Sequence, residues 1–523
     1  MADRTAGTRL MAARRIGRMA PLALVIALAA GCSQGGKETP EEPAAVLATL
    51  DSERCGALDA AGFGAANASA KWVDATGDLP DYCEVTATLS PAQGSSIGAV
   101  YRLPAEWNGK VLGIGGGGWA GNVTLEAAAE ALSKGYATLQ TDGGHPGTSP
   151  WDNSWATNPE SATDFSWRAI HEMTVAGKQL VSNAYDAQHR RAYFQGCSTG
   201  GRMALMEAQR FPEDYDAIIA GAPVYTLQVQ TSAVLRNNTF ARNNGGFSAD
   251  DLKLVQSSVL AACDADDGLK DGLVGDPRQC RWNPADLECS GEKTATCLAP
   301  AQVEAIRTIY NGIHAPDGQW AMFPMSRGGE PGWSLFVGTA GAGEDATGGG
   351  GLLTLAPLLF DGRKVDFAKF DPRKDVPAVR QSAFAQTYEA KDPQLQPFFQ
   401  RGGKLLLWHG ENDPGPSPVG TIDYAQSVQA STAGAKDGMR LFLMPGVEHC
   451  RGGPGADQVA LLDALDGWVE RGTAPERLIG RKADSDLVRP HCAWPNMARY
   501  GGSGDANDPA NWQCTPRAGT SKS

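Results

Sequence analysis

The chain has 523 residues, of which 42% are hydrophobic and 20% charged, and its mean hydropathy is −0.29. This composition excludes wholesale disorder, a collagen-like chain and a polytopic membrane protein. The net charge of −13 argues against nucleic acid or an anionic membrane as the main partner, so we expect a small-molecule substrate or ligand.

The first 31 residues have the pattern of an export signal. Five arginines within residues 1–18 precede an apolar run, residues 19–30, that is too short to cross a membrane as a stable helix. The run ends in AAGCS, as bacterial lipoprotein signals do, so Cys32 is predicted to become the lipidated first residue, followed by a polar tether over 32–47. We expect a protein held at the bacterial outer membrane only through a lipid on Cys32. The alternative is ordinary signal cleavage, which would leave a periplasmic or secreted protein.

Buried strands and amphipathic helices alternate along much of the remaining chain. Strands are predicted at 110–118, 191–196, 404–410 and 439–446, and helices at 166–186, 201–211 and 457–472. This alternation predicts an α/β fold with a mostly parallel sheet covered on both faces. This alternation stops in residues 223–400, where the sequence is rich in Gly and Cys. We interpret this segment as a lid domain inserted between two parts of the core, 48–222 and 401–523.

A candidate nucleophile lies between the predicted strand 191–196 and the helix that follows it. The sequence Gly196-Cys197-Ser198-Thr199-Gly200 matches G-x-S-x-G, and strand–turn–helix is the context that a nucleophile elbow requires. The glycines permit the tight turn that raises the Ser198 hydroxyl above the sheet. The pattern therefore predicts Ser198 as a catalytic nucleophile.

Chain order selects the partners of this serine. In this fold class the acid and then the histidine follow the serine on loops after later strands, which removes three of the seven histidines: His145, His171 and His189. His314 lies in the insertion, and His491 lies beyond the last predicted helix, so His449 is the predicted base. Asp413 follows the strand 404–410 and is a stronger candidate for the acid than Glu411.

Two further features of the site are predicted from the same loops. An oxyanion hole needs backbone N–H donors, and we expect one from Thr199 and the other from the glycine run 115–118, with Gly117 and Gly118 as candidates. His409 stands four residues before Asp413 and is expected to line the substrate site without acting as the base.

Ten cysteines remain after Cys32, and an even number in an exported chain implies disulfides. Pairing of nearest neighbours would join Cys55–Cys83, Cys263–Cys280, Cys289–Cys297 and Cys492–Cys514. That would leave Cys197 and Cys450 to each other. The sequence alone does not establish this connectivity.

Several of these motifs together resemble the tannase and feruloyl esterase family, and the resemblance covers roughly residues 50–515. They are GGGGWAG, TDGGHPG, the stretch from HEMTVAG to AGAPV, CDADDGLKDGLVGDPRQC, HGENDPGPSP and VEHCRGGPG. The resemblance implies an α/β-hydrolase fold with a bonded Cys beside both the catalytic Ser and His, here Cys197 and Cys450. It supports Asp413 as the acid and the five pairs above. The sequence departs from the family pattern at Glu448, just before the predicted base His449. Its side chain either places a charge beside the base or points to solvent.

The segment 264–273 carries four aspartates in eight residues, and such a density of hard oxygen ligands suits calcium. It is not an EF-hand, because its fifth position is glycine and no glutamate closes the loop. The resemblance implies a structural calcium held by the side chains of Asp264, Asp267 and Asp271 and by the carbonyls of Leu269 and Leu273. A metal-free acidic turn is the alternative, and Asp266 is expected to be solvated.

The combined prediction is a serine esterase that hydrolyses esters of aromatic acids of feruloyl, galloyl or terephthaloyl type through an acyl-enzyme. Trp333 and Phe336 are candidates for an apolar wall against the acyl ring, and packing in the core of the lid is the alternative for both. Two other functions stay open. One is an amidase or peptidase on the same triad, and the other is a non-catalytic, calcium-stabilised surface binding protein.

Overall fold

The computed structural model describes eight stretches of the chain: residues 45–58, 62–121, 123–147, 149–150, 152–242, 246–335, 352–366 and 369–517. The predicted signal, Cys32 and Phe336 lie outside these stretches. Within them, no helix is both long enough and apolar enough to cross a membrane.

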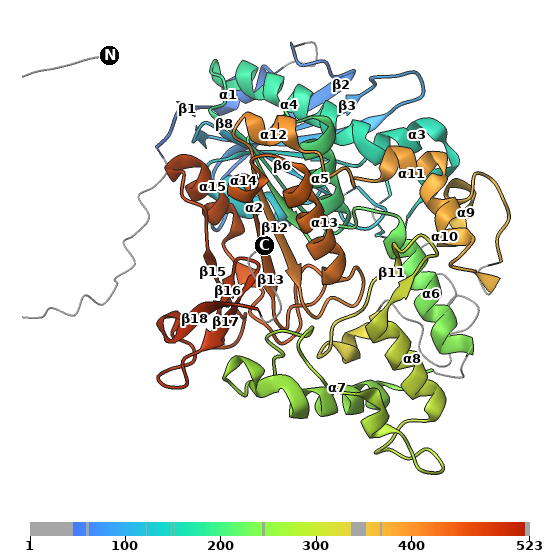
Figure 1. Ribbon diagram of the computed structural model, residues 1–523. Coiled ribbons are helices and arrows are strands. Elements are labelled where there is room, and N and C mark those ends of the chain that lie inside the picture. Colours follow the sequence, from blue (N-terminus) through green and yellow to red (C-terminus); the bar gives the residue numbers. More distant parts are fainter. Residues whose placement is uncertain are drawn as a thin grey trace, which may run out of the picture. The chain divides into compact units, whose positions relative to one another are not determined.

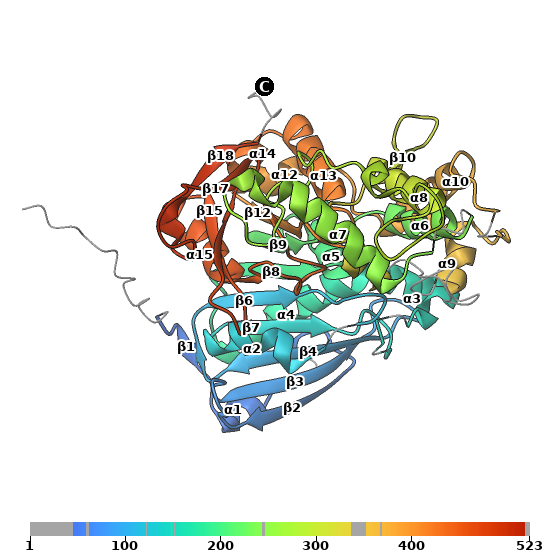
Figure 2. The same ribbon diagram turned by 90° about the horizontal axis from the view of Figure 1, so that it is seen from below.

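A nine-stranded mixed sheet forms the centre of the fold, in the order β13-β12-β9-β8-β6-β7-β4-β3-β2 (Figure 2). Six neighbouring strands are parallel to one another: β7 (Ala137–Thr141), β6 (Lys110–Ile114), β8 (Arg191–Cys197), β9 (Ala217–Gly221), β12 (Lys404–Gly410) and β13 (Met439–Met444). The remaining three pair antiparallel at one edge: β4 (Ile97–Pro104), β3 (Tyr82–Leu89) and β2 (Asn67–Val73). A mostly parallel sheet is therefore present, as predicted.

Both faces of this sheet are buried, which explains why its strands are continuous runs of apolar residues. In β12, Leu405 and Leu407 face one core, whereas Leu406 and Trp408 face the other. The first core also contains residues of α4 (Ala169–Tyr185), α5 (Thr199–Arg210) and α13 (Pro418–Ser431). The second contains residues of α2 (Leu125–Ser133) and α15 (Leu461–Arg471).

The four predicted strands and three predicted helices are all present. The strand at 404–410 has the predicted bounds, and the other elements differ from prediction at one or both ends. The first predicted helix begins at Ala169 because a wider helical turn, η3 (Asp164–Arg168), precedes it. The third begins at Leu461, after the short strand β14 (Gln458–Val459). The antiparallel edge β2–β4 was not predicted.

The residues between β9 and β12 form a largely helical insertion beside the sheet (Figure 1). Its elements are α6 (Gln228–Arg242), α7 (Ala249–Cys263), η4 (Asp264–Asp267), η5 (Pro284–Leu287), α8 (Pro300–Asn311), β10 (Ile313–His314), β11 (Trp320–Met322), η6 (Glu330–Leu335), α9 (Leu352–Leu359), α10 (Asp375–Gln381), α11 (Ala383–Tyr388) and α12 (Gln396–Gln400). That this insertion acts as a lid stays a prediction.

Shorter elements complete the fold. Before and within the first part of the core lie β1 (Ala48–Thr49), α1 (Ser52–Gly56), β5 (Glu106–Trp107), η2 (Ser154–Thr157) and α3 (Pro159–Thr163). Towards the C-terminus lie α14 (Ala435–Gly438), β15 (Arg477–Arg481), β16 (Val488–Cys492), β17 (Asn496–Tyr500), η9 (Pro509–Asn511) and β18 (Trp512–Pro516).

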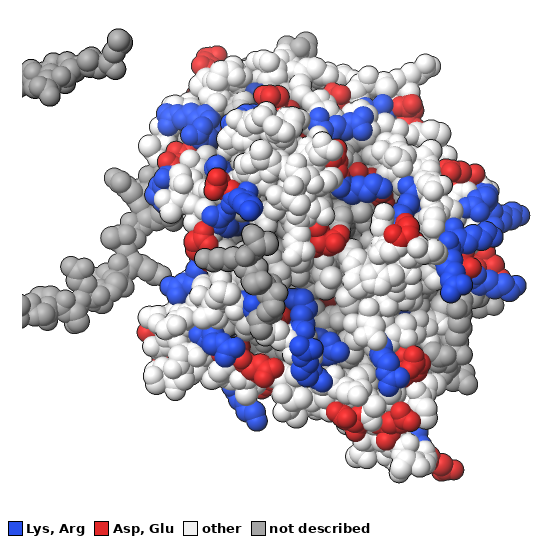
Figure 3. Space-filling view, in the orientation of Figure 1, with Lys and Arg blue, Asp and Glu red and all other residues white. Residues whose placement is uncertain are grey.

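All five disulfides of the predicted pairing are present in the structure. They join Cys55–Cys83, Cys197–Cys450, Cys263–Cys280, Cys289–Cys297 and Cys492–Cys514. On the face shown in Figure 3, small groups of basic and acidic side chains are scattered among uncharged residues.

Candidate active site

Ser198 occupies a strained turn between β8 and α5. Its backbone has φ 63° and ψ −122°, a conformation that a residue with a side chain adopts only where the surrounding structure enforces it. The turn is closed by a hydrogen bond from Ser198 N to Gly221 O at 2.9 Å. A Cβ on Gly196 would lie 2.5 Å from the Gly200 carbonyl carbon, so the elbow has room only for glycine there. The fold therefore presents the Ser198 hydroxyl as the predicted elbow would.

The structure brings together the three residues predicted as a triad. Ser198 Oγ lies 2.9 Å from His449 Nε2, and His449 Nδ1 lies 2.7 Å from Asp413 Oδ2. Because a carboxylate can only accept, Nδ1 carries the proton, which leaves Nε2 to accept the proton of Ser198. This is the arrangement in which a histidine can act as general base toward a serine.

Electrostatics support these roles. Burial opposes ionisation of Asp413, but the charge of His449 and hydrogen bonds from two histidines lower the pKa of Asp413 to about 2. Burial also disfavours the imidazolium of His449, yet the charge of Asp413 outweighs it and raises the pKa of His449 above its ordinary value. Asp413 is therefore ionised at neutral pH and stabilises the imidazolium that forms during proton transfer.

Glu411, the weaker candidate for the acid, is occupied elsewhere. Its carboxylate is fully buried and accepts two hydrogen bonds from the Arg278 guanidinium, at 2.6 and 2.7 Å. His491, the weaker candidate for the base, is 1% exposed, and its Nε2 lies 2.9 Å from Ala456 O. His314 lies on the surface of the insertion, stacked on Trp320. None of these side chains contacts Ser198.

The predicted oxyanion donors lie beside the elbow. Thr199 is the first residue of α5, so its N–H has no intrahelical acceptor. A Cβ on Gly115 would lie 2.7 Å from Gly200 Cα, which shows how closely the glycine run packs on the turn. In that run Gly117 borders open space, whereas Gly118 has φ +62° and packs against Pro150. The arrangement permits the predicted oxyanion hole and does not select between the two glycines.

The Cys197–Cys450 disulfide joins the elbow directly to the histidine loop. Its cysteines are adjacent in sequence to Ser198 and His449, although 253 positions separate them in the chain. Glu448, on the other side of the base, is half-buried and does not simply point to solvent. Burial and the charge of Asp413 raise the pKa of the Glu448 carboxyl.

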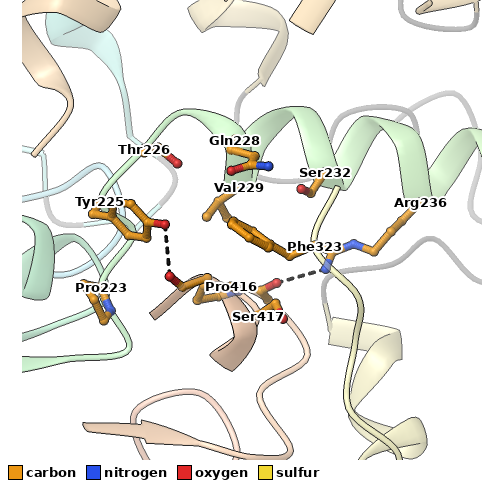
Figure 4. A pocket seen from close by; sticks show the side chains of 12 residues that line it. Pro223, Tyr225, Thr226, Gln228, Val229, Ser232, Arg236, Phe323, Pro416 and Ser417 are labelled. Carbon is orange, nitrogen blue, oxygen red and sulfur yellow. Dashed lines mark hydrogen bonds between the residues drawn. The ribbon is translucent and has the colours of Figure 1, made fainter. Parts of the chain in front are cut away.

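A pocket lies beside the loop that carries Asp413, and its lining comes from three parts of the chain (Figure 4). Arg236, on α6, is 2% exposed, and its Nη1 donates to Gly415 O at 2.9 Å. Gly415 N in turn donates to Asp413 Oδ1 at 2.8 Å. Burial lowers the pKa of Arg236 to about 10, an effect that the charge of Asp413 opposes. The insertion therefore supplies a buried cation that fixes the end of the acid loop.

The predicted substrate-contacting residues fall in different places. Trp333 is 2% exposed in the core of the insertion, where its ring centroid lies 5.7 Å from that of Tyr310. His409 is fully buried and contacts Asp413. Phe336 lies outside the described residues. The setting of Trp333 agrees with the core-packing alternative, and His409 has no exposed surface.

The predicted calcium segment forms a tight acidic turn after α7. Asp264 Oδ1 accepts hydrogen bonds from the backbone N–H groups of Asp271 and Gly272, and Asp271 pairs with Arg489 at 2.6 Å. Asp267 is buried, and burial together with the neighbouring carboxylates raises its pKa to about 7. In the described part of the chain, no three His, Cys, Asp or Glu side chains converge as metal ligands. Asp267 is thus the buried acid of this turn.

Sequence reasoning missed the two arginines of the insertion, Arg236 and Arg278. Arg236 stands in no quoted motif, and Arg278 lies in CDADDGLKDGLVGDPRQC, where no role was assigned to it. Each reaches the acid loop from more than a hundred residues away. The only available signal was the isolated Glu411 at a strand end, because a fully buried carboxylate requires a cationic partner.

Comparisons with known proteins give matches over most of the chain. The family model described as tannase and feruloyl esterase matches residues 83–325 and 356–515. A mono(2-hydroxyethyl) terephthalate hydrolase from Piscinibacter sakaiensis is 34% identical over 513 residues, which cover 83% of this chain and 85% of that protein. A probable feruloyl esterase B-2 from Aspergillus flavus is 30% identical over 483 residues, covering 83% of this chain and 89% of that protein.

A solved structure is similar over nearly the whole fold. The crystal structure of feruloyl esterase B from Aspergillus oryzae matches with a TM-score of 0.79 and 26% sequence identity, covering 89% of this chain and all of that one. The likeness therefore includes the insertion as well as the sheet.

Proposed function

Because the chain belongs to the tannase and feruloyl esterase family, and is therefore a carboxylic ester hydrolase, we propose that it hydrolyses esters of aromatic acids through an acyl-enzyme on Ser198. The proposed acyl groups are of the feruloyl, galloyl or terephthaloyl type. The observation that carries the mechanism is the continuous hydrogen-bonded chain from Ser198 Oγ through His449 to Asp413.

The chemistry follows from that chain. Ser198 Oγ bonds to the ester carbonyl carbon while its proton passes to His449 Nε2, and backbone N–H groups at Thr199 and the 115–118 run stabilise the resulting oxyanion. The bond to the alcohol oxygen then breaks as His449 returns the proton to the leaving alcohol. Water repeats the sequence on the acyl-enzyme, which releases the acid and restores Ser198.

A screen of substrates tests this proposal. Wild-type protein should hydrolyse at least one of methyl ferulate, methyl gallate and a terephthalate monoester, and a fluorophosphonate probe should label Ser198. Turnover of anilides without turnover of aryl esters would instead identify an amidase or peptidase. A protein that neither turns over these esters nor reacts with the probe would be a binding protein.

We propose that the insertion acts as a lid over the site. The support is the approach of η6 to the catalytic loops, since a Cβ on Gly332 would lie 3.4 Å from Glu448 Oε1 and 3.6 Å from Pro414 Cβ. The acyl ring would then lie between the core and this insertion. Spin labels on η6 and β13 would measure the distance between the insertion and the core. A distance that never changes would contradict the proposal that the insertion acts as a lid.

We propose further that a structural calcium ion binds at the turn after α7. The side chains of Asp264, Asp267 and Asp271 and the carbonyls of Leu269 and Leu273 would hold it, and it would contribute stability without entering the chemistry. The support is Asp267, a buried carboxylate with which no basic side chain of the described residues forms an ion pair.

Export and lipid attachment are also proposals, and they rest on the sequence alone. The Arg-rich start, the apolar run and the AAGCS sequence support processing before Cys32. Expression in a bacterial host followed by membrane fractionation tests this. The wild type should sediment with the outer membrane, and Cys32→Ala should not.

A further inference from the structure

A second histidine contacts the catalytic acid, and the mechanism above does not use it. His409, at the end of β12, is fully buried. Its Nε2 lies 3.1 Å from Asp413 Oδ2 and 3.1 Å from Pro416 O, and its Nδ1 lies 2.7 Å from the Thr421 hydroxyl. Because its side chain is fully buried, His409 presents no exposed surface to a substrate.

The neighbours of His409 determine where its proton lies. Both groups beside Nε2, a carboxylate and a proline carbonyl, can only accept a hydrogen bond, so Nε2 carries the proton. In the neutral ring Nδ1 is then an acceptor, and it accepts from the Thr421 hydroxyl. Thr421, on the first turns of α13, thus fixes the tautomer that turns an N–H toward Asp413.

As a result, a single carboxylate oxygen receives N–H groups from two imidazoles. His449 Nδ1 lies 2.7 Å and His409 Nε2 lies 3.1 Å from Asp413 Oδ2, while Asp413 Oδ1 accepts from Gly415 N. We propose that His409 is a positioning residue of the triad, which holds Asp413 toward His449 and, with Thr421, tunes how strongly Asp413 attracts the proton of the base. This inference rests on the proposed serine esterase function.

The sign of the effect follows from hydrogen bonding to an anion. A donor on Oδ2 stabilises the carboxylate and reduces its pull on His449, so removing that donor increases the proton affinity of the Asp413–His449 pair. The acid limb of the pH–activity profile, where activity falls as the pH is lowered, should then move to higher pH. The other charged groups acting on Asp413 come from separate elements, Arg236 on α6 and Glu448 beside the base, and they are unchanged by substitution of His409.

The experiment compares four variants with the wild type in the full-length protein. His409→Phe removes the donor at similar volume, His409→Gln retains an N–H near the position of Nε2, and Thr421→Val removes only the tautomer-fixing hydroxyl. His171→Phe is the matched control, because His171 Nδ1 also binds an aspartate, Asp214 at 2.7 Å, just before β9 and at the opposite end of the strands from the site.

Two readouts are measured across pH: kcat and KM on p-nitrophenyl acetate, and the rate at which a fluorophosphonate labels Ser198. For His409→Phe we expect kcat to fall about 10- to 100-fold, the range for a hydrogen bond to a charged group, with KM little changed. Its acid limb should move to higher pH in both readouts. His409→Gln should shift less, Thr421→Val should shift in the same direction, and His171→Phe should not shift.

The inference is overturned if the acid limb stays in place in His409→Phe, if His409→Gln shifts as far as His409→Phe, or if His171→Phe shifts equally. If His409→Phe does not fold, Thr421→Val decides: an acid limb that stays in place in that variant overturns the inference. Failure of the proposed function looks different, because the wild type itself would then show no labelling of Ser198.

Discussion

Removal of the Cys197–Cys450 disulfide should inactivate the enzyme more completely than it unfolds it. The chain-entropy account gives a disulfide that closes a segment of 253 positions a stabilisation of about 5 kcal/mol at most, because the cross-link restricts the unfolded chain. The catalytic effect has another origin. The 2.9 Å contact between Ser198 and His449 joins two loops that this disulfide holds together. Without it, each loop keeps its own strand but loses the covalent link to the other.

The assay compares Cys197→Ala/Cys450→Ala with Cys289→Ala/Cys297→Ala, which removes a bond between cysteines only 8 positions apart. The same account assigns that shorter loop roughly half the stabilisation. Urea unfolding, circular dichroism at 25 °C and kcat on an aryl ester are measured for both. We expect the first variant to remain folded with kcat reduced at least about 100-fold, and the second to keep its activity. A folded first variant with near wild-type kcat, or a free thiol at Cys197 in active protein, would refute the reasoning.

Four further predictions concern the nucleophile, pH, the metal and the insertion. Ser198→Ala should abolish ester hydrolysis while leaving the melting temperature close to that of the wild type, and His449→Ala should be nearly as severe. Because Asp413 raises the pKa of His449, and the base must be neutral, kcat/KM should decline as the pH falls through a value above about 6.5. Chelation should lower the melting temperature of the wild type and leave that of Asp267→Asn unchanged, and metal analysis without calcium would contradict the site. Trp333→Ala should lower activity on aromatic and acetyl esters alike, because the ring is buried in the insertion, and a selective loss on aromatic esters would instead place it in the substrate wall.

The sequence predicted those parts of the site that a local pattern determines. Ser198 stands in a strand–turn–helix motif, and Asp413 and His449 follow apolar strands in the chain order of the fold class, so topology alone brings them to one edge of the sheet. The pairing of Cys197 with Cys450 was left over once the nearest neighbours were paired, and the family resemblance implied it; the structure contains this disulfide.

The hydrogen bonds that hold the catalytic acid, Asp413, could not be predicted in this way. His409 was expected to face substrate because it ends a strand near Asp413, yet its side chain turns inward to Asp413 and Thr421. Periodicity places a residue on a strand, but it does not say which buried polar groups will satisfy one another. That choice depends on packing between α13 and the loop after β12, which no window of the sequence contains.

The insertion holds the acid loop as well as flanking the site. Arg278 binds Glu411, Gly328 O accepts from Asn412 Nδ2 at 3.1 Å, and Arg236 donates to Gly415 O. All three partners lie between β9 and β12, so the insertion fixes both ends of the loop that carries Asp413. Loss of the contact of Arg236 or of Gly328 O would take a hydrogen-bond partner from a buried polar group of the loop, and loss of Arg278 would leave Glu411 with the longer ion pair to Arg517, at 3.6 Å. We expect the resulting displacement to reach Asp413. Sequence changes in the insertion should therefore alter kcat through the acid as well as KM through the substrate pocket.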